Sequence, residues 1–252
     1  MALGGLGLFF LEAGAGTAFL LLFFPTRELG KGFFSLHGLL AFVFLLFATL
    51  VRPQGLLMPV AVGTTVALAA YTLAAHGGRA SAARPLLAGG AFAALGQLVK
   101  VALEAPHGTT NGWTVAGALL GGLFFGAVLL IMNLGHWYLV SRSLPFQLLA
   151  RGAALFAALA AARTLLLLFA LAWNPSREGL APLVSLERDA LFFLFRVLWG
   201  IVGPLALSYF IWKTADMKSN QAATGLLYVA LLFVLIGELL SSYLTVATGF
   251  PA

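Results

Sequence analysis

The chain has 252 residues, of which 62% are hydrophobic and 9% are charged, and its formal net charge is +6. A soluble domain carries about 25% charged residues, so this composition excludes a water-soluble globular protein and predicts lipid as the solvent. The basic residues are scattered singly, which argues against nucleic acid as a partner. No cysteine is present, which excludes disulfides, iron–sulfur ligation, thiolate zinc sites and thiol catalysis by this chain.

Apolar stretches of about 20 residues, the length that crosses a bilayer as a helix, recur along the chain. The expected membrane helices are 2–24, 32–51, 56–75, 86–105, 113–140, 148–173, 190–213 and 222–247. The first has no positively charged leader and is long enough to span, so we expect it to be retained. We therefore predict an all-α polytopic bundle of about eight transmembrane helices, forming a single integral membrane domain over 1–252.

Basic residues in the connections predict the orientation of the bundle, because they are enriched on the cytoplasmic side. The connections after the first, third, fifth and seventh helices hold Arg27, Lys31, Arg79, Arg84, Arg142, Lys213 and Lys218. The connections on the other side hold Arg52, Arg177 and Arg188. This asymmetry predicts that both termini lie on the periplasmic side of a bacterial inner membrane.

Ionisable residues lie within or at the ends of these apolar stretches: Glu12, Lys100, Glu104, Arg163, Arg196 and Glu238. A charge in a membrane helix costs about 2.5–3.5 kcal/mol, so it usually has a partner and marks a pathway or ligand site. Lys100 and Glu104 are one turn apart, which predicts an ion pair on one helix face. Depth along the helices places all six in the outer half of the membrane or at its midplane. They form either buried salt bridges that set helix register or a polar pocket that exchanges protons with a ligand.

Small residues and breakers mark two of the helices. The fifth carries two interleaved rows of glycine at four-residue spacing, which predict close helix packing: Gly117, Gly121, Gly122 and Gly126. In the seventh, Gly203-Pro204 predicts a kink at mid-depth, because proline cannot donate to the preceding turn. In the eighth, Glu238, Ser241 and Ser242 share one face, which suits a proton relay or a hydrogen-bonded buried acid.

The end of the fifth helix predicts a second ligand site. His136, Trp137, Tyr138 and Arg142 could bind a quinone headgroup by hydrogen bonding and stacking, or could anchor the helix end at the interface. His37 in the second helix lies at a depth similar to that of His136. Such a match on two helices is what bis-histidine ligation of haem b requires.

Two segments resemble a known family. They are Leu235-Ile236-Gly237-Glu238-Leu239-Leu240, followed by Tyr243, and Phe195-Arg196-Val197. Both resemble the last two helices of the DmsC/NrfD-like membrane subunits. The resemblance implies an anchor of eight or more helices that oxidises or reduces quinol for an attached molybdenum and iron–sulfur enzyme. It also implies that Glu238 and Arg196 lie at or near the quinol site. This chain has Ser241-Ser242 where that family tends to place an arginine.

The leading hypothesis is a membrane subunit of a respiratory or electron-transfer complex that binds menaquinone or ubiquinone and exchanges its protons. Its partners would be the lipid bilayer and other subunits, and it would be at most a subunit without the catalytic centre. Glu12, Arg196 and Glu238 are the first candidates for headgroup contact and proton exchange; no metal motif is apparent. The alternatives are a b-type cytochrome, a secondary transporter or channel, and a structural or assembly subunit without ligand. A transporter would often show internal repeats, and no sequence repeat relates 1–126 to 127–252.

Overall fold

The computed structural model describes residues 2–51, 57–104, 111–140, 144–145, 147–173 and 188–250. Within these ranges the chain is all-α, and eight helical spans are long and apolar enough to cross a membrane. The single helices are α1 (Ala2–Leu21), α2 (Thr26–Val51), α3 (Met58–His76), α4 (Arg84–Leu103), α5 (Asn111–Val140), α6 (Gln147–Trp173) and α10 (Asn220–Thr248). The seventh span consists of α8 (Arg188–Val197), the π-helix η3 (Leu198–Val202) and α9 (Gly203–Asp216). The predicted helix count and fold class are confirmed, and the protein is a multi-pass membrane protein.

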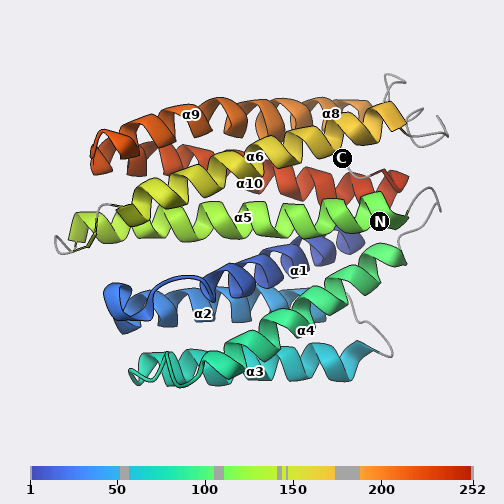
Figure 1. Ribbon diagram of the computed structural model, residues 1–252. Coiled ribbons are helices and arrows are strands. Elements are labelled where there is room, and N and C mark those ends of the chain that lie inside the picture. Colours follow the sequence, from blue (N-terminus) through green and yellow to red (C-terminus); the bar gives the residue numbers. More distant parts are fainter. Residues whose placement is uncertain are drawn as a thin grey trace.

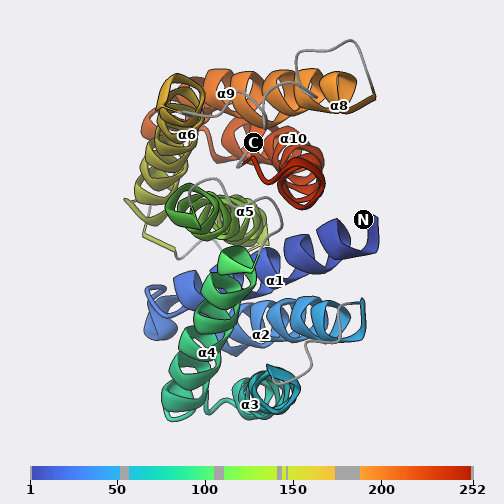
Figure 2. The same cartoon turned by 90° about the vertical axis from the view of Figure 1, so that its right-hand side faces the viewer.

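The eight spans form two four-helix bundles that lie side by side (Figures 1 and 2). In the first bundle, α1 and α3 each pack against α2 and α4. In the second, α5 and α9 each pack against α6 and α10. The bundles meet through α1 and α5, with α1 also touching α10 and α4 touching α5. The same up-and-down arrangement therefore occurs twice, although the two halves of the sequence show no repeat.

The ends of the bundle differ in charge. The start of α1 and the end of α10 lie at the same end (Figure 1), as an even number of spans requires. The turns at the opposite end join α1 to α2, α3 to α4 and α9 to α10. These turns and the helix ends beside them hold most of the described basic residues: Arg27, Lys31, Arg79, Arg84, Lys213 and Lys218. Arg52, Arg142 and Arg177 lie outside the described residues. Which end faces the cytoplasm stays a prediction of the basic-residue asymmetry.

The two bundles touch through glycine. A Cβ on Gly16 of α1 would lie 1.8 Å from the carbonyl oxygen of Gly122 in α5. A Cβ on Gly126 would lie 2.6 Å from the carbonyl carbon of Gly16. Such backbone contact is possible only without side chains, so the predicted close packing of the fifth helix is confirmed, with α1 as its partner. α1 and α5 are accordingly the most enclosed spans of the molecule.

Glycine and proline also reshape two helices. Gly30 has φ 69°, so the first turn of α2 is set at an angle to the rest of that helix. α2 begins at Thr26, before the predicted start at residue 32. In the seventh span the π-helix η3 ends two residues before Pro204, where the sequence predicts a kink. There the N–H of Gly203 donates to the carbonyl of Leu198, five residues back. Widened turns of this kind are frequent at functional sites.

Candidate functional site

Four ionisable side chains converge where the second bundle meets α1. Glu238 comes from α10, Arg163 from α6, Arg196 from α8 and Glu12 from α1. None of the four is more than 5% exposed, and Arg196 is fully buried. We call these four residues, with Ser241 and Ser242, the buried charge cluster. The sequence-based expectation that these charges gather is met for four of the six candidates.

Glu238 is the centre of the buried charge cluster. Arg163 Nη2 lies 2.9 Å from Glu238 Oε2, and its Nε donates to Oε1 at 3.2 Å, which makes a bidentate pair. Arg196 Nη2 donates to Oε1 at 3.1 Å. One carboxylate therefore faces two guanidinium groups, and these three side chains together carry one excess positive charge when all are ionised.

Ser241 and Ser242 extend the cluster, and Ser242 joins it to Glu12. Arg163 Nη2 also donates to Ser241 Oγ at 2.7 Å. Ser242 Oγ lies 2.7 Å from Glu12 Oε2 and 2.9 Å from the backbone carbonyl oxygen of Glu238. A hydroxyl has one proton and cannot donate to both oxygens. When it donates to Glu12, this carboxyl joins the cluster through a neutral group rather than through an arginine.

Glu12 also affects the charge balance of the cluster. An ionised Glu12 neutralises the excess positive charge left by Glu238, Arg163 and Arg196, whereas a protonated Glu12 leaves it in an apolar interior. Because Glu12 bonds to a neutral serine, its proton can change without breaking an ion pair, which makes it the member of the cluster best suited to gain and lose a proton.

Three glycines make room for these side chains. A Cβ on Gly121 would lie 2.6 Å from Glu238 Oε2. A Cβ on Gly200 in η3 would lie 2.1 Å from Arg196 Nη1, and one on Gly237 would lie 2.2 Å from the Cα of Gly200. The Arg196 guanidinium therefore lies against a backbone contact between η3 and α10. The sequence pattern marked Gly121 and Gly237 without indicating that they border the charges.

Arg196 has hydrogen-bond donors that no described residue accepts. Its Nη2 binds Glu238, but its Nε and Nη1 are buried with no hydrogen-bond partner among the described residues. An unpaired buried donor costs about 1–3 kcal/mol, and more when it is charged. A buried cation whose Nε and Nη1 have no partner among the described residues is suited to an acceptor such as a water or a carbonyl oxygen.

A cavity of about 220 Å³ lies between three of the helices that carry the buried charge cluster. It is lined by Leu6, Phe192, Leu239, Leu240 and Tyr243, from α1, α8 and α10. The rings of Phe192 and Tyr243 meet nearly edge-on, 5.3 Å apart. Leu239 follows Glu238 in the chain, and Phe192 lies one turn before Arg196. An apolar, partly aromatic space is therefore formed by the helices that carry Glu12, Arg196 and Glu238, and none of these three residues is part of its lining.

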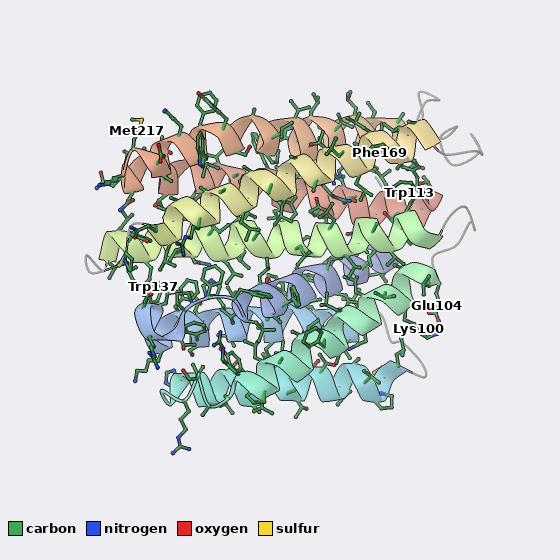
Figure 3. All side chains as sticks on the ribbon, in the orientation of Figure 1. Lys100, Glu104, Trp113, Trp137, Phe169 and Met217 are labelled. Atoms are coloured by element: carbon green, nitrogen blue, oxygen red, sulfur yellow. The ribbon has the colours of Figure 1, made fainter. Side chains whose placement is uncertain are left out.

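The other two predicted charges lie apart from the cluster. Lys100 Nζ is 2.8 Å from Glu104 Oε1, so the predicted pair forms. Both side chains are 54% exposed, at the end of α4 in the first bundle (Figure 3). This is a surface pair at the end of the helix, and the structure does not bring it into the buried charge cluster.

The residues of the predicted second site point to three different neighbours. His136 is exposed, with Nδ1 3.3 Å from the Tyr228 hydroxyl on α10. Trp137 lies at the opposite end of α5 from Trp113 (Figure 3) and packs edge-on against Phe33 of α2, with ring centroids 5.8 Å apart. The Tyr138 hydroxyl donates to the carbonyl of Pro145. Arg142 lies outside the described residues. These contacts tie α5 to α10, to α2 and to the start of α6.

The two histidines proposed as haem ligands have different surroundings. His37 is fully buried, its Nδ1 is 2.7 Å from the carbonyl oxygen of Phe33, and its Nε2 has no partner among the described residues. His136 is exposed and contacts Tyr228. The structure does not bring these imidazoles to one site. Among the described residues, no group of three or more His, Asp or Glu could hold a metal ion.

One buried polar pair escaped the sequence reasoning. Gln97 of α4 donates to Thr64 Oγ1 of α3 at 2.9 Å, and both side chains are buried. These helices correspond to α10 and the seventh span of the second bundle, which hold Glu238 and Arg196. An amide within an apolar stretch was the available signal.

Comparisons of the chain with protein-family models, with curated proteins and with solved structures give no match.

Proposed function

We propose that this protein is a quinone-binding membrane subunit of an electron-transfer complex, and that its buried charge cluster exchanges protons with the quinol. The quinone ring would lie beside Arg196 and Glu238, and Glu12 would exchange the proton. The electrons would pass to cofactors of partner subunits, because this chain has no thiol to hold an iron–sulfur cluster.

The observation that carries the proposal is the buried charge cluster itself. Buried ion pairs add little to stability, and replacing them with apolar residues is often neutral or stabilising. Beyond the Glu238 pairs, the cluster holds one further carboxyl. Glu12 is that carboxyl, and it joins the cluster through a neutral hydroxyl rather than through an arginine.

Two further features support a quinone as the ligand. The free N–H groups of Arg196 suit the carbonyl oxygens of a quinone, which accept hydrogen bonds. The cavity between α1, α8 and α10, with Phe192 and Tyr243 in its wall, suits an aromatic ring with an apolar tail. The resemblance of the Gly237-Glu238-Leu239 segment to the DmsC/NrfD-like subunits points to the same chemistry.

The first test compares Glu12→Gln with Glu104→Gln, a matched change at an exposed carboxyl. The amide at position 12 can still accept from Ser242 but cannot release a proton. With the complex purified from native membranes, Glu12→Gln should slow quinol-linked turnover by about 100-fold, the usual contribution of a positioned acid or base. Glu104→Gln should leave turnover unchanged. Equal turnover in both variants, or no quinone extracted from the purified wild-type protein, would contradict the proposal.

A further inference from the structure

A second cavity, of about 330 Å³, lies at the end of the molecule where α1 finishes. We call it the Arg151 cavity. Its walls combine the end of α1 and the turn after it with parts of α5 and α6: Leu20, Phe23, Leu134, Leu148, Leu155 and Arg151. α1 belongs to the first bundle, and α5 and α6 belong to the second. The cavity therefore lies on the seam between the two bundles.

The lining of the Arg151 cavity is apolar except for one cation. Of the residues that line the cavity, Arg151 carries the charge. Its side chain is exposed, and no ion pair joins it to an acid among the described residues. The basic residues of the connecting turns gather at this end of the bundle, which the basic-residue asymmetry predicts to be cytoplasmic. An anionic group at the rim would meet an unpaired positive charge.

A second arginine holds one wall in place. Arg84, at the start of α4, donates through Nη2 to the carbonyl of Leu22 at 2.5 Å and to that of Phe24 at 3.4 Å. These carbonyls belong to the turn after α1, which contributes Phe23 and Phe24 to the cavity. The wall is therefore held in place by contacts within the chain, and Arg84 adds positive charge behind it.

We propose that the Arg151 cavity binds an anionic phospholipid, with its phosphate on Arg151 and one acyl chain against the apolar lining. The planar guanidinium suits a phosphate, which it can bind through two parallel hydrogen bonds. Anionic lipids are enriched in the cytoplasmic leaflet, and basic pockets between membrane helices on that side bind their headgroups. The lipid would fill the space between α1 and α6 and so brace the two bundles. This proposal does not depend on quinone binding.

The test is native mass spectrometry of the purified, delipidated full chain in detergent. The probes are phosphatidylglycerol and phosphatidylcholine with identical acyl chains. Wild-type protein should retain phosphatidylglycerol about fivefold better, which corresponds to about 1 kcal/mol for one basic residue at a headgroup. Arg151→Gln should lose this preference, whereas Arg79→Gln, an exposed cation on the α3–α4 turn, should keep it. Leu155→Trp, which fills the cavity from a 39% exposed position, should lower retention of both lipids.

Equal retention of the two lipids by the wild type would overturn the proposal. So would an equal loss of preference in the Arg151 and Arg79 variants, because it would reflect the general charge of this end. Loss of the preference in excess inorganic phosphate, with total lipid retention unchanged, would assign Arg151 to a free anion and also overturn it.

Discussion

At the scale of single residues, Glu238 supplies the charge that holds the site together. Two arginines bind one carboxylate in an apolar interior, and removing this carboxylate would take an ion pair from each arginine. The three helices that carry these side chains, α6, α8 and α10, are thereby held in one register. Glu12 differs from Glu238 because its bond is to a neutral serine, so its proton can change without breaking an ion pair.

Glu238→Gln should therefore destabilise the protein far more than a matched surface change. Breaking a buried pair by removing one partner costs about 3–5 kcal/mol, because a charge is left buried and uncompensated. Glu104→Gln breaks an exposed pair and should cost about 0–1 kcal/mol. Thermal unfolding in detergent, monitored by the yield of monodisperse protein at each temperature, gives the unfolding midpoint of each variant. Similar midpoints for the two variants would show that Glu238 does not neutralise the arginines.

The Glu12→Gln variant separates stability from chemistry. It should unfold near the wild-type temperature, because its amide oxygen can still accept from Ser242 and no ion pair is lost. Quinol-linked turnover should fall while the unfolding midpoint stays the same. A residue that served only packing would instead lower the unfolding midpoint when it is changed. A large drop in the midpoint of Glu12→Gln would assign Glu12 to the structure rather than to proton exchange.

At the scale of elements, η3 is the feature that sets the geometry of the site. Pro204 has no N–H to offer the carbonyl four residues earlier, at Gly200, and the turn before it widens. Gly200 then lies in backbone contact with Gly237, with the Arg196 guanidinium beside it. The position of the unpaired Arg196 donors depends on this local departure from the α-helix.

Gly200→Ala should disturb the site with a single methyl group. The new Cβ would lie 2.1 Å from Arg196 Nη1 and would push the guanidinium away from its place. We expect a loss of about 1–3 kcal/mol in stability, as for other overpacked positions, together with weaker binding of a short-chain quinone. Gly63→Ala, where a Cβ would meet nothing within 4 Å, is the matched control. Unchanged quinone binding in Gly200→Ala would place the quinone away from Arg196.

At the scale of the whole molecule, two bundles of the same arrangement have different interiors. The first has a neutral pair, Gln97 with Thr64, between its third and fourth helices. The second has the Arg196–Glu238 ion pair between the corresponding helices. Ionic chemistry in the described interior is therefore concentrated in one bundle and in the α1 helix that borders it.

The orientation of the bundle can be tested cleanly because the chain has no cysteine of its own. Single-cysteine variants Glu104→Cys and Arg79→Cys lie near opposite ends of the first bundle, and both positions are exposed. A maleimide that cannot cross membranes should label Glu104→Cys in cells whose outer membrane is permeabilised, and Arg79→Cys only after the inner membrane is opened. The reverse pattern would invert the predicted topology.

The sequence by itself determined the membrane class, the eight spans and a set of six candidate charges that includes the four buried ones. These follow from local composition, since 20 apolar residues form a helix in lipid whatever their neighbours. The Lys100–Glu104 pair was predictable for the same reason, because both residues are on one helix.

Tertiary structure alone decided which of the charges meet. Glu12 and Ser242 are 230 residues apart, and no local pattern records that their helices touch. It also separated Lys100 and Glu104 from the cluster, and turned His136 toward α10 while His37 stayed enclosed. The reason is physical: helical period fixes which face a residue is on, but the rotation and pairing of helices follow from packing over their whole length, here through the glycine contact of α1 with α5.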